Sequence, residues 1–402
     1  MLSPTRLGWG LVLVFLVSAP SWAEPGEPVV PLVPDDAVAS ALSSNPDVLA
    51  AEAALLLAEG ELAQALGANP SLSGSLLMDG PAELQLSQPV SPTGAGVHAR
   101  HAASARVDEA EAMLHRTRFE VAHGVRTAYT EAVVATRVSQ VADEGLALAT
   151  RLHAAVVRLH EEGEASTLDL NLARLAQAQA AARLLDALEG EADALVALAA
   201  IVTRPVESRS LLLDLALIAP TPSHAGERSD VLAAQSALLA AEREIAAQRA
   251  AAVSPLLVGV VAESQDGATL VGPSLTVELP VRDRNQAGRA GALGDLQVAE
   301  SRLVETQAVA TMEVTTATRR DELATSALLA VGEYPMAAAR AALASVEAGY
   351  LAGEIDLTST VLLQAQILDG ETAVVQLEGH VATARLDLLL ATEDPVLLGG
   401  AR

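Results

Sequence analysis

The sequence predicts a mostly α-helical fold with a small β part, in which one unit of helix, β-hairpin and long helical hairpin occurs twice. The first observation is an internal repeat: residues 44–75 resemble residues 229–259, and Asp47-Val-Leu-Ala-Ala recurs as Asp230-Val-Leu-Ala-Ala. The second is composition, because 51% of the 402 residues are apolar but only 2% are aromatic, which favours closely packed helices. The third is the absence of proline between Pro92 and Pro205, which favours long helices.

The N-terminal residues have the pattern of a cleaved export signal. Arg6 supplies the positive region, residues 7–17 form an apolar stretch, and Ser21-Trp22-Ala23 is a small-x-small cleavage site. The apolar stretch is shorter than the roughly 20 residues of a membrane-spanning helix. The sequence therefore predicts a signal peptide over residues 1–23, followed by an extended, proline-rich segment over residues 24–36.

A first structural repeat is expected over residues 37–204, and it opens with two short helices. After these helices, polar and apolar residues alternate on both sides of Asp79-Gly80. This pattern is typical of a β-hairpin, because successive side chains of a strand point to opposite faces and Asp-Gly suits a tight turn. We expect its strands at about 70–78 and 82–91.

A long helical hairpin completes the first repeat. Charged residues decorate an Ala/Val/Leu pattern at helical spacing from 97 to 161 and again from 167 to 203. Gly163 suits a helix C-cap and Ser166 the next N-cap, so we expect the helical tip near residue 163. At about 1.5 Å per residue the first helix would be near 95 Å long, and such a helix needs partners along its length.

The second half of the chain repeats this order of elements. Asp266-Gly267 matches Asp79-Gly80, Gly353 matches Gly163 as the helical tip, and Pro335 should interrupt the first long helix. The matches predict a linker at 205–228, a second structural repeat over 229–394 with strands at about 255–264 and 271–281, and a C-terminal tail at 395–402.

Four predicted strands cannot close a barrel alone. If the strands lie in a membrane, the unpaired backbone groups at the sheet edges must bond to other copies, because lipid offers them no partner. Three copies would give 12 strands, a size found among outer-membrane barrels. A trimer therefore follows if the strands are embedded in a membrane.

Charge and cysteine content exclude several classes of function. The net charge is −26, there is no Lys, and the Arg residues form no basic stripe, so nucleic acid is not expected as a partner. The absence of Cys excludes disulfides, thiolate metal sites and a lipid anchor on an N-terminal Cys. The acidic surplus fits either a cation-attracting lumen or a solvated outer face, and the sequence does not assign helix faces.

We expect no enzyme activity and no cofactor. The sequence contains no nucleophile–base set, phosphate-binding loop or metal motif. His160 lies beside Glu161, Glu162 and Glu164, which could hold a divalent cation weakly. Scattered surface histidines are the preferred interpretation, so no metal site is predicted.

Three segments, taken in order, resemble the TolC-type outer-membrane efflux proteins over nearly the whole mature chain. The matching segments are Asn45-Pro46 with Asn69-Pro70, then Val271-Gly-Pro-Ser-Leu-Thr-Val-Glu-Leu-Pro-Val-Arg-Asp-Arg-Asn285 with Gly288, and finally Gly349-Tyr350-Leu-Ala-Gly353 with Leu357 and Gln364-Ala-Gln366. Each segment alone is a weak signal. Together, inside a duplicated and exported chain, they are specific.

The resemblance implies a homotrimer whose 12-stranded β-barrel sits in the outer membrane and continues as an α-helical barrel across the periplasm. It implies a periplasmic adaptor and an inner-membrane pump as partners. The implied function is the exit duct of a tripartite efflux system for small molecules or metal ions. Alternatives are the duct of a type I protein-secretion system and a soluble periplasmic coiled-coil scaffold or adaptor. The substrate, the pump and the adaptor are not specified.

The resemblance also implies two sets of functional residues. The helical tips dock the adaptor, which assigns this role to Gly163, Glu164, Ser166, Gly353, Glu354 and Asp356. Acidic residues just beyond the second tip can ring and constrict the aperture in the family, but here the matching positions are Ser359 and Leu362, so that ring is absent. Asp169 lies at the corresponding place in the first repeat. We therefore expect Asp169 and Ser359 as a possible aperture gate, with a solvated acid at a helix start as the alternative for Asp169. Simple helix capping is the alternative for the six tip residues.

One departure concerns the predicted strands. Membrane barrels usually carry Trp and Tyr girdles at both interfaces, and no aromatic residue lies in or near these strands. The hairpin loops are also very short, so little of the chain would project beyond the strands.

Overall fold

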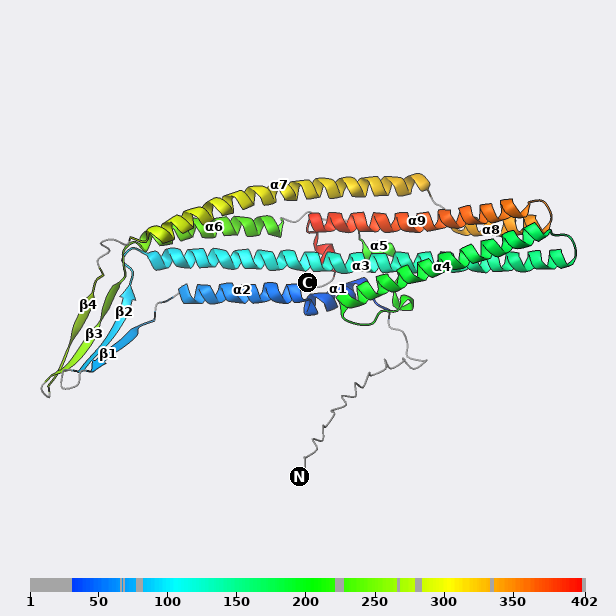
Figure 1. Cartoon of the computed structure of the whole chain (residues 1–402). Coiled ribbons are helices and arrows are strands. Elements are labelled where there is room, and N and C mark those ends of the chain that lie inside the picture. The colour runs from blue at the N-terminus through cyan, green and yellow to red at the C-terminus, as the bar shows by residue number, and fades with distance from the viewer. Residues whose placement is uncertain are drawn as a thin grey trace, which may run out of the picture.

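The computed structural model describes residues 31–65, 67, 69–76, 82–220, 228–265, 268–278, 284–332 and 336–399. The described part of the molecule is elongated (Figure 1). Its four strands lie at one end, the connections α3–α4 and α8–α9 lie at the other, and long helices run between them. The predicted signal peptide, most of the proline-rich segment and the last three residues of the predicted tail lie outside the described residues.

The elements of the first repeat follow the predicted order of helices, hairpin and long helical hairpin. They are α1 (Pro34–Ser44), α2 (Pro46–Ala65), β1 (Ser71–Leu76), β2 (Ala82–Val90), α3 (Ala95–Glu161) and α4 (Thr167–Val202). At about 1.5 Å per residue, α3 is close to 100 Å long. It is stable at this length because α2, α4, α6 and α9 all pack along it.

The second repeat has the same order, but its first long helix is divided. The elements are α6 (Ser229–Ala250), β3 (Leu256–Gln265), β4 (Ala268–Thr276), α7 (Gln286–Val331), α8 (Met336–Leu351) and α9 (Leu357–Ala391). α7 ends where Gly332 adopts a φ of 72°, a conformation that favours glycine. The interruption predicted at Pro335 is therefore already made at Gly332, and Pro335 itself lies outside the described residues.

The four strands form one antiparallel sheet in the order β1-β2-β3-β4. The β2–β3 pair joins the two repeats, with Leu86 opposite Val260. The prediction of the last strand was wrong by several residues: β4 spans 268–276, not 271–281. β4 begins directly after a short connection and ends opposite Leu257, because Pro255 before β3 has no backbone N–H to extend the ladder. The first strand, predicted at 70–78, is described over Ser71–Leu76.

The main hydrophobic core lies around the middle of α3, where the first and last described segments of the chain meet the predicted linker. Arg126 of α3 is 1% exposed, and its guanidinium donates to the Leu397 and Ile218 carbonyls at 2.8 and 2.9 Å and to Asp35 at 2.5 Å. Tyr129 donates to the Leu32 carbonyl at 2.6 Å. The segment expected as a plain linker thus packs into the core over its described part, which includes a turn at Ser208–Ser210 and α5 (Leu215–Ile218).

Candidate functional site

The sheet has two chemically different faces. Successive side chains of a strand point to opposite faces, and residues paired across neighbouring strands share a face. The pairing therefore assigns each strand residue to one of the two faces. One face is mainly apolar. It includes Leu72, Gly74, Ala82, Leu84, Leu86, Val90, Leu256, Val258, Val260, Ala262, Val271, Pro273 and Leu275, with Gln88, Ser264 and Thr269 as its polar members. Leu72 is 66% exposed and Val271 67%, so no other part of the described chain covers this face.

The opposite face is mainly polar or small. It carries Ser71, Ser73, Ser75, Glu83, Gln85, Ser87, Gly259, Glu263, Gly272, Ser274 and Thr276, together with Pro89, Leu257, Val261, Ala268 and Leu270. Gln85 reaches across the sheet to Ser274 at 3.2 Å. Ser274 lies opposite Gly259, where an added Cβ would lie 2.1 Å from the Leu86 carbonyl oxygen. The sheet therefore separates an apolar side from a hydrogen-bonding side.

Both edges of the sheet are open within the described residues. β1 pairs only with β2, and β4 pairs only with β3. An open edge carries a row of backbone donors and acceptors that can pair with another strand. A second sheet of the same kind could therefore bond to either edge.

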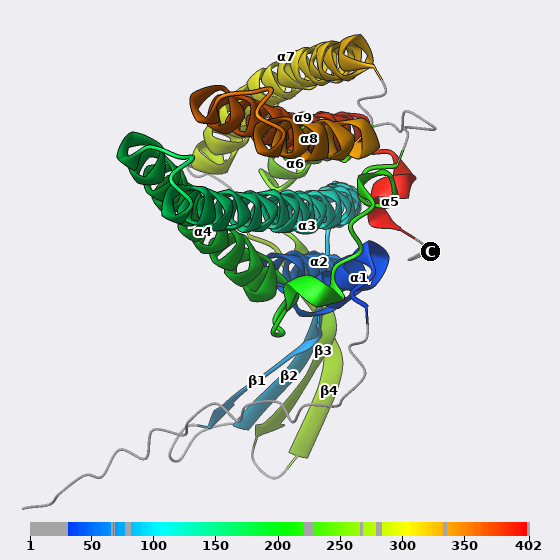
Figure 2. The same cartoon turned by 90° about the vertical axis from the view of Figure 1, so that its right-hand side faces the viewer.

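The helical layer also has two uncovered sides. Seen end-on, α7 lies at one side and α2 and α4 at the other, with α3 and α9 between them (Figure 2). Large apolar side chains on these outer helices are exposed, including Leu168 at 75%, Val196 at 68%, Val304 at 68% and Leu329 at 75%. Such rows of exposed apolar residues mark interaction surfaces.

The two helical tips share one backbone geometry. Gly163 and Gly353 have φ values of 81° and 74°. In the first tip, Glu164 N–H donates to the Leu159 carbonyl and Gly163 N–H to the His160 carbonyl; in the second, Glu354 N–H donates to the Gly349 carbonyl and Gly353 N–H to the Tyr350 carbonyl. This is the Schellman pattern of a helix end, and it explains both glycines.

The helix caps at the two tips use the same pair of residue types in opposite order, Ser then Asp at the first tip and Asp then Ser at the second. Ser166 caps α4 and forms a capping box with Asp169, whose carboxylate accepts from the Ser166 N–H at 3.0 Å. At the second tip the acid comes first: Asp356 caps α9, accepting from the Ser359 N–H at 3.1 Å and the Ser359 hydroxyl at 2.6 Å. These bonds lower the pKa of Asp356. The candidate gate residues Asp169 and Ser359 are each held within their own tip by these bonds.

A small core joins the two tips. It contains Leu152, Val156, Ala173 and Leu357, with Tyr350 packed against it. Burial, and then the negative charge of Asp169, raise the pKa of the Tyr350 phenol, so the structure brings Asp169 of the first repeat near Tyr350 of the second. The Gly-Tyr motif at 349–350 was visible in the sequence, but nothing in its pattern indicated this pairing.

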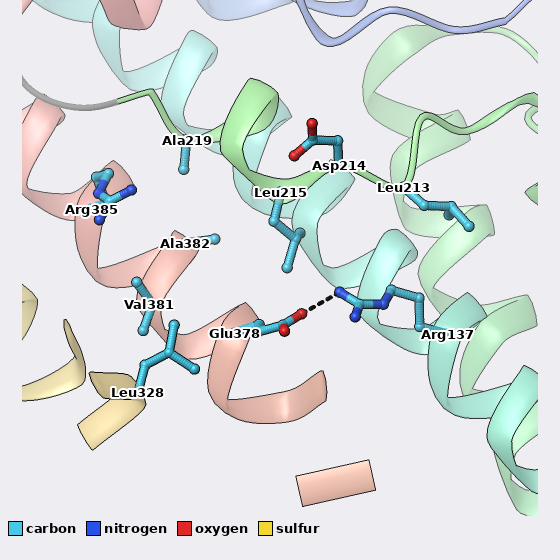
Figure 3. A pocket seen from close by; sticks show the side chains of 10 residues that line it. All are labelled: Arg137, Leu213, Asp214, Leu215, Ala219, Leu328, Glu378, Val381, Ala382 and Arg385. Atoms are coloured by element: carbon cyan, nitrogen blue, oxygen red, sulfur yellow. Dashed lines mark hydrogen bonds and ion pairs between the residues drawn. The ribbon is translucent and has the colours of Figure 1, made fainter. Parts of the chain in front are cut away.

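A surface cleft of about 590 Å³ opens between α3, the segment around α5, and α9 (Figure 3). Arg137 and Glu378 pair across it at 2.5 Å, and Arg385, also in the lining, pairs with Asp321 at 3.7 Å. The two arginines of the cleft thus already have carboxylate partners. The described part of the chain contains no group of three or more His, Asp or Glu side chains that could hold a metal ion.

No described helix combines the length and the apolar character needed to cross a membrane.

Known proteins resemble the chain in structure. No protein-family model and no curated protein sequence matches it. Among solved structures, CusC, studied for its transmembrane channel formation, matches with a TM-score of 0.72 at 19% identity over 90% of this chain and 92% of its own. The outer membrane protein VceC of Vibrio cholerae gives 0.70 at 18%, covering 90% and 96%. The outer membrane channel CmeC of Campylobacter jejuni gives 0.68 at 16%, covering 98% and 93%. The chain therefore has the fold of these proteins, as its resemblance to TolC-type proteins predicted.

Proposed function

We propose that three copies of this chain form an outer-membrane exit duct, a 12-stranded barrel that continues as a tube of long helices. The observation that carries the proposal is the two-faced sheet with two open edges. Its apolar face suits lipid and its polar face suits a water-filled lumen. The similar structures are outer-membrane proteins or channels, which supports the same role here.

The dimensions of the sheet support a place in the membrane. β3 has 10 residues and β2 has nine. A tilted strand of roughly 9 to 11 residues crosses the hydrocarbon core of a bilayer. If β4 of one copy pairs with β1 of the next, the backbone N–H and C=O groups at every sheet edge gain partners. Such pairing is necessary in a bilayer, because lipid offers these groups no hydrogen bonds.

The helices support the same assembly. If the sheets join in a ring, α7 of one copy comes next to α2 and α4 of the neighbouring copy. Most of the large apolar side chains that are exposed on described helices of the single chain lie on α2, α4 and α7. Assembly would bury them, which is a favourable change of hydrophobic free energy.

The helical tips are the proposed contact with a periplasmic adaptor, which would join the duct to an inner-membrane pump. Gly163, Glu164, Ser166, Gly353, Glu354 and Asp356 lie in these turns, at the end of the molecule opposite the sheet (Figure 1). We propose Asp169 as the gate residue, acting with Tyr350 rather than with Ser359, because Tyr350 packs on the core that joins the two tips whereas Ser359 is bonded to Asp356 within its own tip.

Small molecules or metal ions are the proposed cargo, and service to a protein-secretion pump is the second possibility within the same class. A soluble scaffold is the competing class. In a scaffold, the strands would pack their apolar face on helices. Here that face is exposed, with Leu84 at 52% and Leu275 at 66%. This exposure favours the duct.

Neighbouring residues on opposite faces of β2 test the proposal. Arg in place of Leu84 should disrupt assembly, because a cation on the lipid face near the midplane costs about 2 to 4 kcal/mol. Arg in place of Gln85 should leave assembly intact and change ion conductance, since that side faces the proposed lumen. Equal effects of Leu84→Arg and Gln85→Arg on heat-resistant assembly in detergent would contradict the proposed orientation.

A further inference from the structure

Glu371, in the middle of α9, is a fully buried acid without a hydrogen-bond donor. None of its surface is exposed, and neither carboxylate oxygen accepts a hydrogen bond. The other buried glutamates with described partners differ: Glu191 accepts from Thr136 and Ser139, and Glu393 accepts from Ser229. A carboxylate buried in this way is strongly disfavoured in its charged form, so the site selects the protonated acid.

The charges around Glu371 favour the same form. Glu144 of α3 and Arg340 of α8 act on it, and Arg340 is already paired with Glu144 at 3.1 Å. Burial, and then the charge of Glu144, raise the pKa of Glu371, while Arg340 opposes them only in part. The neighbouring charged groups on α9 also have partners: Asp369 with Arg183 of α4, Glu378 with Arg137 of α3, Arg385 with Asp321 of α7 and Asp387 with Arg320 of α7.

α8, the helix that carries Arg340, is weakly fastened to its neighbours. The chain enters α8 after the break at Gly332. Ala339 and Leu343 are buried on α8, which packs on α9. Two ion pairs tie α8 to α3, Arg340 with Glu144 at 3.1 Å and Arg151 with Glu347 at 3.7 Å, and three of their four side chains are more than 40% exposed. Exposed ion pairs contribute little to stability.

We propose that Glu371 is a proton-binding site that controls the docking of α8 on α3 and α9. With the proton bound, the acid is neutral and α8 packs over it. When the proton leaves, a negative charge appears on the buried Glu371 carboxylate, where the charge of the half-exposed Glu144 also disfavours it, and displacement of α8 lets water reach it. This inference concerns one chain and does not rest on the proposed duct.

The direction of the pH effect follows from linkage. With α8 displaced, the carboxyl group regains the ordinary glutamate pKa of about 4.3. With α8 docked, its pKa is raised. Docking is therefore strongest below the ordinary pKa and weakens as pH rises toward the raised value, by up to about tenfold in the docking equilibrium per pH unit. Because α8 leads into the tip at Gly353, a rise in pH would loosen that tip.

The absence of native Cys allows a direct test in the full mature chain in detergent. Spin labels on Ala147→Cys of α3 and Ala344→Cys of α8, both exposed positions, report the distance between the two helices. We expect one short distance at about pH 5 and a growing longer population toward about pH 8.5. In Glu371→Gln the short distance should persist at both values. Asp369→Asn, two residues away and exposed, is the matched control and should behave like the parent.

Thermal melting over the same range gives an independent readout. The melting temperature of the parent should fall relative to Glu371→Gln as pH rises. Glu371→Met, apolar and of similar volume, should give the same result as Glu371→Gln. If one of the two variants does not fold, the other still provides the comparison. Parallel pH profiles of parent and variants would overturn the proposal. A lower melting temperature of both variants at high pH would also overturn it, because the ionised acid would then have a cationic partner.

Discussion

The first long helix differs between the two repeats, being continuous in the first and divided in the second. α3 runs without a break over Ala95–Glu161 and is buried on several sides. The matching part of the second repeat is divided into α7 and α8 at Gly332, and the buried residues of α7 are a single stripe, Ala292, Ala299, Ala310 and Ala317. The difference teaches that α3 is the central support of the fold, whereas α7 and α8 form an edge with a joint. The following changes should break or sharpen this contrast.

The largest effect is expected at the point where α3 is anchored in the core. Arg126→Met leaves Asp35 and the Leu397 and Ile218 carbonyls without their buried donor. The two buried carbonyls lose their donor, at about 1 to 3 kcal/mol each, whereas the Asp35 side chain is 53% exposed and can bond to water. The matched change on α7, Arg320→Met, removes an exposed ion pair and should cost less than about 1 kcal/mol. Chemical denaturation measures both values, and similar costs would remove the distinction between support and edge.

Replacing glycine by alanine should have opposite effects on stability at the α7–α8 junction and in the interior of α3. Gly332→Ala forces a side chain into a backbone conformation open mainly to glycine, at about 1 to 3 kcal/mol. Gly124→Ala, in the middle of α3 with open space around its Cβ, should stabilise by about 0.5 to 1 kcal/mol. Hydrogen exchange should place the Gly332→Ala effect at the α7–α8 junction. A stabilising Gly332→Ala would show that a continuous helix is acceptable there.

A smaller effect is expected at the first tip. Ser166→Ala removes the cap of α4 and its capping box with Asp169, at about 1 kcal/mol. Ser166→Asp keeps an N-cap acceptor and should retain most of the stability. Thermal melting by circular dichroism ranks these variants. If Ser166→Ala and Ser166→Asp melt alike, the cap does not stabilise the tip.

The smallest effect is expected at the second tip, where the cap is an acid. The pKa of Asp356 is lowered, mainly by the Ser359 hydroxyl, so its contribution is present above the ordinary aspartate pKa and is lost as pH falls through the lowered value. Asp356→Asn keeps an uncharged cap and should match the parent near pH 7. Its melting temperature should then change less than that of the parent on acidification, and identical acid profiles would contradict the role of the charge.

Much of this architecture was predictable because local rules specify it. The duplication follows from the spacing of matching residues in the two halves. The paired strands on either side of each Asp-Gly and the helix ends at Gly163 and Gly353 follow from turn chemistry. Other features depend on contacts between residues far apart in the chain. Arg126 gave no local signal that it would join three segments, and Glu371 reads in sequence as an ordinary solvated helix residue. Asp169 was identified by position, yet its neighbour Tyr350 became evident only from the fold.

The mass of the protein extracted from the outer-membrane fraction tests the central claim most directly. The account predicts that the full mature chain fractionates with the outer membrane, and that native mass spectrometry in detergent gives three chains. This result is expected because the open edges of β1 and β4 require partners and the apolar sheet face requires lipid. A monomer recovered from the soluble periplasm would contradict the duct.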